Sequence, residues 1–244
     1  MLSKIQKHTI DIYDLKSKKY QVEIVNARDL LTTSRFDLFA KLFYIRNIDN
    51  DKELALKVYT EHIKAFNPDF CEPGRDDKTS LNDFVSAFDK LINHFKDKEF
   101  DSSISVIPVS EDYVILDGAH RLAALAYWNK KVEIVRFSEV KPKGVFDFRY
   151  FRHRGLSIST SNIIANSVNS IKSNLMTFVE ATKGNVIVLS DAIESIESSC
   201  FEGCTSLKSV TLPASVKRIG DSCFNRCTSI ESITIPEGVE TIGI

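Results

Sequence analysis

The stretch "SSCFEGCTSLKSVTLPASVKRIG" (residues 198–220) decides the fold of the last part of the chain, because the next 23 residues repeat it. In "DSCFNRCTSIESITIPEGVETIG" (residues 221–243), equivalent residues follow one another at a constant offset of 23. The matched pairs are Cys200 with Cys223, Phe201 with Phe224, Cys204 with Cys227, Leu207 with Ile230, Pro213 with Pro236 and Ile219 with Ile242. A decayed copy precedes them in "VIVLSDAIESIE", where Leu189 matches Leu212 and Ile196 matches Ile219. This period predicts leucine-rich repeats, in which each unit supplies a strand that needs stacked neighbours to bury its apolar side.

The repeated cysteines allow two interpretations. "CFEGC" and "CFNRC" offer four thiols as two C-x3-C pairs, a spacing that zinc sites also use. Equivalent positions in stacked repeats point the same way, however, so the repeat alone predicts two buried ladders of cysteine side chains. Cys71, beside an acidic loop, lacks the basic neighbours that mark a reactive thiol.

The segment "CFEGCTSLKSVTLPASVKRIG" closely resembles the BspA-type leucine-rich repeat, and this resemblance covers residues 185–244. It implies a docking surface for a protein partner on the exposed strand face, at positions such as Lys208, Ser209, Glu231 and Ser232. The repeats end at "TIGI" partway through a unit and without a polar closing segment, so we expect a remnant array or one that packs on something else.

Composition sets limits on the function. Lys plus Arg (32) nearly balance Asp plus Glu (33), so no overall field would draw the chain to nucleic acid or an anionic membrane. The N-terminus has no apolar core of signal-peptide length, and no stretch has the length of a membrane helix. Five cysteines, an odd number, argue against a disulfide framework. We therefore expect a cytoplasmic protein with no membrane partner.

The first 145 residues predict an α+β domain. Alternating residues in "HTIDIYDLKSKKYQVEIV" favour a short hairpin, and "SISVIPV", "YVIL" and "KVEIVRF" favour strands. Helices are predicted over "SRFDLFAKLFYIRN", which Ser34 would cap, over "DKELALKVYTEHIKAF" up to Pro68, and over 118–128. A further helix follows a capping box formed by Ser80 and Asp83. After Pro142, "FDFRYFRHRG" predicts a short aromatic and basic helix, most simply with a solvated face.

The stretch "VILDGAHRLAAL" (residues 114–125) places polar groups between a strand and an apolar helix. Gly118 lets an anion approach the backbone, Arg121 can bind phosphate oxygens in a bidentate manner, and the helix start supplies free N–H groups. Small Ala119 leaves the approach open, and His120 adds an imidazole. The alternative is that Asp117 simply caps the helix and that the first turn is solvated. The anion-site interpretation is favoured by His120 and Arg121, because a cation at a helix N-terminus is unfavourable unless an anion binds there.

The same residues resemble the signature turn of the ParB/sulfiredoxin-like superfamily, which binds nucleotide phosphates. Together with "RFDLFAKLFY", "YTEHIKAF", "EPGRDDKTSLNDFVSAFDKLI" and "IPV", they resemble ParB-like proteins of bacterial glycan-synthesis clusters, over residues 20–155. The resemblance implies a nucleotide (ATP, ADP or CTP) with Mg, bound by Asp117, Gly118, Ala119, His120 and Arg121. Ala119 replaces the reactive cysteine of sulfiredoxin, which argues against sulfinic-acid reduction.

A kinase-like member of this superfamily needs a carboxylate near the acceptor hydroxyl and positive charge near the phosphate. The resemblance assigns the carboxylate to Glu72 in "CEPGRDDK", with Lys78 nearby, and adds His120 as a second catalytic group. Arg35, Asp37 and Lys41 in "RFDLFAK" would complete the pocket. The alternatives are that Glu72 is an ordinary loop acid and that Arg35 and Lys41 lie on a solvated helix face.

His62 allows two interpretations: a further group of the site, or a hydrogen-bonded core imidazole on the apolar face of its helix. The expected domains are a ParB/sulfiredoxin-like nucleotide-binding domain (1–145), a helical linker (146–184) and BspA-type repeats (185–244).

Two functions follow. The first is a nucleotide-dependent phosphotransferase acting on a hydroxyl of a small metabolite or glycan precursor, with the repeats as a docking module. The second is a non-catalytic interaction protein whose repeats bind a protein partner and whose first domain is a nucleotide switch or scaffold. Nucleic acid is an unlikely partner, because residues 157–176 lack a basic recognition helix.

Overall fold

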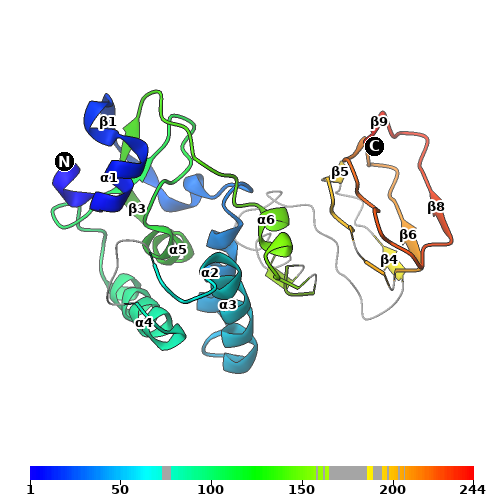
Figure 1. Cartoon of the computed structure of the whole chain (residues 1–244), viewed down its shortest axis with the longest axis horizontal. Coiled ribbons are helices and arrows are strands. Elements are labelled where there is room, and N and C mark those ends of the chain that lie inside the picture. The colour runs from blue at the N-terminus through cyan, green and yellow to red at the C-terminus, as the bar shows by residue number, and fades with distance from the viewer. Residues whose placement is uncertain are drawn as a thin grey trace. The chain divides into compact units, whose positions relative to one another are not determined.

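The computed structural model forms two compact units, Met1–Leu156 and Ser157–Ile244 (Figure 1). The described residues are 1–72, 78–157, 159–161, 163–164, 186–188, 194–196, 198–202, 204–205 and 207–244, and for 186–188 only the backbone is described. Most of the helical linker expected at 146–184 lies outside these residues, as does Leu189. No helix in the described ranges is both long enough and apolar enough to span a membrane.

A three-stranded sheet organises the first unit. Its strands are β1 (Tyr20–Asn26), β2 (Ile107–Val109) and β3 (Lys131–Phe137), in the order β1-β3-β2. β3 pairs antiparallel with β1 and parallel with β2. The strand expected at "YVIL" is wrong: this segment makes only an isolated bridge between Val109 and Ile115, because a left-handed turn at Tyr113 (φ 59°) bends the chain.

The hairpin expected over residues 8–25 is also wrong in its first half. Residues Lys7–Tyr13 form helix α1, which Asp14 ends in a left-handed conformation, and only β1 is a strand. A helix lets Ile10 pack with Leu15 against the sheet, in a cluster that includes Val135 and Phe137. Short 3-10 helices flank these elements at Leu2–Lys4, Leu15–Ser17 and Ala27–Leu30.

Helices make up the rest of the first unit: α2 (Phe36–Asn47), α3 (Lys52–Phe66), α4 (Leu81–Asp97), α5 (Ala119–Tyr127) and α6 (Phe148–His153). The capping box of Ser80 and Asp83 is confirmed at the start of α4. Ser34, by contrast, does not cap α2, since the N-cap is Arg35 and the Ser34 hydroxyl pairs with Thr32.

An aromatic cluster joins α2, α3 and α4 in the core. The rings of Tyr44 and Tyr59 lie 4.8 Å apart, and Phe88 lies 5.5 Å and 5.6 Å from them. Helix α5 packs on α2 and α4, so its first turn lies beside this cluster. The aromatic cluster therefore packs directly against the first turn of α5, which carries polar groups described below.

The second unit has two parallel three-stranded sheets. One has the order β4-β6-β8 and the other the order β5-β7-β9. The strands are β4 (Val186–Val188), β5 (Ser195–Ile196), β6 (Ser209–Thr211), β7 (Arg218–Ile219), β8 (Ser232–Thr234) and β9 (Thr241–Ile242).

Every strand pair in this unit keeps the offset of 23 that the sequence predicts, as in Ser209 opposite Ser232. The rings of Phe201 and Phe224 stack at 5.2 Å and 7°. The predicted repeat is thus confirmed in register as well as in period.

The cysteines occupy equivalent places in successive repeats. Cys200 and Cys223 are buried, whereas Cys204 and Cys227 are half-buried. Burial raises the pKa of Cys223 to about 12 and that of Cys227 to about 11, and the Cys227 thiol donates a 2.9 Å hydrogen bond to the Phe201 carbonyl. Zinc needs thiolates, and within the described ranges no group of three or more His, Cys, Asp or Glu side chains is arranged to hold a metal ion.

Candidate functional site

Three charged side chains form a buried cluster at the start of α2. Arg35 donates from Nε and Nη2 to the two carboxylate oxygens of Asp37, at 2.8 and 2.9 Å. Lys41 Nζ donates to Oδ2 and to the carbonyl of Asp37, both at 3.2 Å. The solvated-face interpretation of Arg35 and Lys41 is wrong, since these residues are only 7% and 3% exposed.

The charges of this cluster shift one another's pKa values. Burial by itself would raise the pKa of Asp37, but Arg35 and Lys41 hold that pKa well below its usual range. Burial lowers the pKa of Lys41, against the opposing attraction of Asp37. A second anchor comes from the fold, because Arg35 Nη1 donates a 2.6 Å hydrogen bond to the Ile115 carbonyl. The cluster thus joins α2 to the segment that leads into "DGAHR".

His120 faces this charged cluster from the first turn of α5. Its Nε2 lies 2.8 Å from the hydroxyl of Tyr59, and its ring packs edge-on against Phe88 at 4.8 Å. Burial, then the positive charges of Lys41 and Lys78, lower its pKa well below the usual value. The imidazole is therefore neutral at pH 7, and it forms a hydrogen bond with the hydroxyl of Tyr59. Tyr59 was missed by the sequence analysis; its only signal is its position three residues before His62 on α3.

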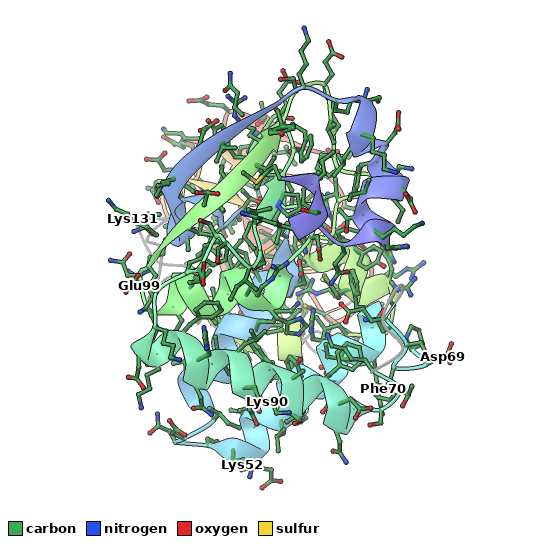
Figure 2. All side chains as sticks on the ribbon, turned by 90° about the vertical axis from the view of Figure 1, so that its left-hand side faces the viewer. Lys52, Asp69, Phe70, Lys90, Glu99 and Lys131 are labelled. Atoms are coloured by element: carbon green, nitrogen blue, oxygen red, sulfur yellow. The ribbon has the colours of Figure 1, made fainter. Side chains whose placement is uncertain are left out.

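Glu72 and Lys78 form an ion pair across the segment between α3 and α4. Figure 2 labels Asp69 and Phe70, which belong to this segment. The Lys78 side chain is buried and lies 4.8 Å above the Phe84 ring, whereas the Glu72 side chain is 30% exposed. Residues 73–77 of the "CEPGRDDK" loop lie outside the described residues.

The "DGAHR" turn has a geometry that only glycine fits easily. Gly118 is the N-cap of α5 with φ +86°, and an added Cβ would lie 2.7 Å from Ile107 Cδ1 and 2.9 Å from Arg121 Nη2. Asp117 does not cap the helix, which corrects the capping alternative: its Oδ1 accepts a 2.6 Å bond from the Gly118 N–H. Arg121 Nη2 lies 3.8 Å from Asp117 Oδ2, so the guanidinium lies close to the glycine.

His62 departs from the expected hydrogen-bonded imidazole. It is 1% exposed, and neither ring nitrogen has a hydrogen-bond partner among the described residues. Its ring lies 5.1 Å from Phe151. Burial, with the charges of Lys41 and Arg35 outweighing that of Asp37, lowers its pKa well below the usual value. Two neutral histidines therefore border one set of buried charges.

The first unit thus gathers several of the residues that the resemblance assigns to a site. Arg35, Asp37 and Lys41 touch directly, and the charges of Lys41 and Lys78 act on His120. Chemically, the group combines the buried cations Arg35, Lys41 and Lys78, the carboxylates of Asp37 and Glu72, and a neutral imidazole. Such a set suits the binding of a phosphate group and the movement of a proton.

The second unit presents two distinct surfaces, one on each of its sheets. On the β5-β7-β9 sheet, a hollow of about 350 Å³ spans three successive repeats. It is lined by Ile196, Ser198, Arg218, Ile219, Gly220, Asp221, Thr241, Ile242 and Gly243. On the β4-β6-β8 sheet, Lys208, Glu231 and Ser232 are exposed as expected, while Ser209 is half-buried.

Comparison with known proteins identifies the second part of the chain. Residues 150–244 match the family described as the BspA type Leucine rich repeat region, in six copies. The matched region starts upstream of residue 185, where the sequence analysis placed the first repeat. No curated protein and no solved structure matches the chain significantly.

Proposed function

We propose that this chain is an interaction protein whose leucine-rich repeats bind a protein partner. The observation that carries the proposal is the hollow on the β5-β7-β9 sheet, which draws side chains from three stacked repeats. Stacked repeats build extended surfaces that recognise other proteins, and here the hollow offers a cation, a carboxylate and hydroxyl groups within one depression.

The chemistry of the hollow indicates the kind of partner segment. Arg218 and Thr241 are exposed, and Asp221 supplies the opposite charge. Main-chain amide and carbonyl groups of an extended segment can bond to such mixed donors and acceptors. The segment would cross the repeats rather than enter one deep pocket.

Substitutions in the hollow test this proposal. We expect Thr241→Arg, which fills the hollow, and Arg218→Glu, which reverses its charge, to weaken partner binding at least tenfold, or about 1.4 kcal/mol. The partner would be isolated by cross-linking from an extract of the source organism, and its affinity then measured with purified proteins.

The opposite sheet supplies the matched controls. Lys208→Glu and Glu231→Lys make comparable charge changes at exposed positions outside the hollow, and they should alter the affinity less than twofold. A partner whose affinity depends on Lys208 and Glu231 but not on Arg218 would move the binding surface to the β6–β8 face. A partner unaffected by all four changes would overturn the proposal.

A second candidate function concerns the first unit, which we propose to be a ParB-like domain that binds a nucleotide (ATP, ADP or CTP) with Mg. What supports it is the close approach of Arg121 to Gly118, a position where any side chain would collide with Ile107. The first turn of α5 and Arg121 would hold the phosphates, and Lys41 and Lys78 would add positive charge. In a phosphotransferase, Glu72 would accept the proton of the acceptor hydroxyl.

Calorimetric titration of ATP, ADP, CTP and GTP with magnesium tests the second candidate. We expect micromolar binding by the wild type and at least a tenfold loss in Arg121→Ala, because bidentate contacts to phosphate are strong. Glu72→Gln should retain nucleotide affinity, since this carboxylate would act in chemistry and not on the phosphates. No binding by a folded wild type would exclude both the kinase and the nucleotide switch, and it would leave the repeats as the functional part.

A further inference from the structure

Among the described residues, strand β1 pairs with another strand along only one of its two edges. It lies at the end of the sheet order β1-β3-β2, so within the described ranges its backbone ladder joins it to β3 alone (Figure 2). Bonds in an antiparallel ladder alternate, so successive residues of β1 point their backbone groups alternately toward β3 and away from it. Two backbone hydrogen bonds of 2.9 Å at the ends of the ladder, from Ser138 N–H to the Lys19 carbonyl and from Ala27 N–H to the Lys130 carbonyl, show which residues point toward β3. These are the odd-numbered residues.

The backbone N–H and C=O groups of Tyr20, Val22 and Ile24 therefore point away from β3. Their side chains share one face and are unusually exposed for apolar residues, at 42%, 44% and 69%. Proteins normally protect an edge strand with lysine, proline or a bulge. β1, with the sequence "YQVEIVN", contains none of these over its seven residues.

The opposite face of β1 is polar and ordered. Arg136 of β3 donates from Nε to Glu23 at 2.7 Å and from Nη2 to Gln21 at 2.5 Å. Glu23 also accepts a 2.9 Å hydrogen bond from the Tyr113 hydroxyl. An incoming strand would therefore meet an apolar row on one face and a fixed amide and carboxylate on the other.

We propose that β1 pairs with β1 of a second copy of this chain, antiparallel about a twofold axis at Val22. In this register Val22 faces Val22, and Tyr20 faces Ile24 of the other copy, so both ends of the apolar row are matched. On the polar face, Gln21 of one copy lies opposite Glu23 of the other. The polar row of Arg136 and Gln21 therefore extends across the axis to the Glu23 carboxylate of the second copy.

Charge argues against the neighbouring register whose axis lies at Glu23. Moving the axis to Glu23 would place two carboxylates directly opposite each other, which destabilises a strand pair. It would also place Tyr20 opposite the polar Asn26 and leave part of the apolar row unmatched. The resulting dimer is isologous, the commonest symmetry of protein oligomers.

Sedimentation of the full chain over a concentration series that reaches about 1 mM tests the proposal, because an interface of one added strand pair is small and predicts weak association. We expect a reversible monomer–dimer equilibrium. Val22→Lys places two ammonium groups on the axis and should weaken the dimer at least tenfold. Ile104→Lys changes an equally apolar residue, 75% exposed and outside β1, and should leave the equilibrium unchanged.

Val22→Pro separates pairing from simple surface hydrophobicity. The Val22 N–H points away from β3, so proline at this position removes a donor to the second copy and none to the existing ladder. We expect a monomer with the circular-dichroism spectrum and denaturation midpoint of a folded chain. If Val22→Pro itself fails to fold, Val22→Lys decides the question.

Cross-linking fixes the register. In a Cys71→Ser background, Val22→Cys should form a disulfide dimer with oxidised glutathione, because paired strand residues lie within disulfide distance. Ile104→Cys is the matched control and should remain monomeric. A wild type that is monomeric at every concentration, or a dimer indifferent to both Val22→Lys and Val22→Pro, would overturn the proposal. Since β1 belongs to the first unit, either result is independent of partner binding by the repeats.

Discussion

Asp37→Asn should lower the free energy of unfolding by about 3–5 kcal/mol, the largest single-residue effect that we expect in this protein. Asp37 is 2% exposed and is the counter-ion of both Arg35 and Lys41. Without its charge, two cations stay buried and uncompensated. Urea denaturation of wild type and variant at pH 7 measures the change.

The exposed pair of Lys7 and Asp11 provides the control. It is also an ion pair, but its side chains are 88% and 49% exposed, so water screens both charges. Asp11→Asn should leave the free energy of unfolding almost unchanged. A similar, small effect for Asp37→Asn would mean that water reaches Arg35 and Lys41 and that the cluster is not a dry one.

An apolar replacement of the whole cluster separates stability from function. The triple variant Arg35→Met, Asp37→Leu, Lys41→Met should fold and be about as stable as the wild type, because buried ion networks gain little over packed hydrophobic side chains. If it folds but loses the nucleotide affinity of the second candidate function, the charges serve binding. If the affinity is retained, the three charges contribute only to the structure of the domain.

Stability should also fall steeply below pH 6.5. The pKa values of His62 and His120 are well below the ordinary value in the folded chain, so the unfolded chain takes up protons first as the pH falls. Each histidine then costs about 1.4 kcal/mol of stability per pH unit, starting near its unfolded pKa of about 6.5 and continuing down to its folded pKa. Above that range neither histidine contributes a pH dependence.

Denaturation midpoints between pH 7.5 and pH 5 measure this slope. His62→Phe removes one of the two titrating groups and should reduce the slope by about 1.4 kcal/mol per pH unit. An unchanged slope in His62→Phe would show that His62 finds a hydrogen-bond partner or a water route that lets it become charged in the folded state.

The sequence predicted best those features that depend on neighbours along the chain. The offset of 23 fixes strand register in the repeats, because equivalent positions stack on one another, and the capping box of Ser80 and Asp83 involves groups only three residues apart. It also predicted α2 to α5 to within a few residues, since long helices carry several turns of periodic pattern.

The failures involve short segments and distant contacts. Seven residues of α1 show too little periodicity to separate a helix from a strand, so the sheet contact of Ile10 decides the outcome. The sequence predicts a solvated face for Arg35 and Lys41, yet α2 is buried from Phe36 to Ile45. Arg35 and Lys41 are buried as well, because both pair with Asp37 and Arg35 also bonds to the Ile115 carbonyl, 80 residues away. His62 on α3 packs against Phe151 of α6 and has no hydrogen-bond partner in the described part of the chain, and no local sequence pattern encodes this packing.

The stacking of Phe201 on Phe224 has a consequence for how such an array can change over generations. The strand pairs and several side-chain contacts between repeats join equivalent positions 23 residues apart, as in the hydrogen bond from Asn225 to Glu202. Removing or duplicating one whole unit in the gene would recreate the same contacts at the new junction. An insertion of any other length would leave a strand or a ring opposite a non-equivalent neighbour. The number of units is therefore free to drift, while the length of each unit is held fixed.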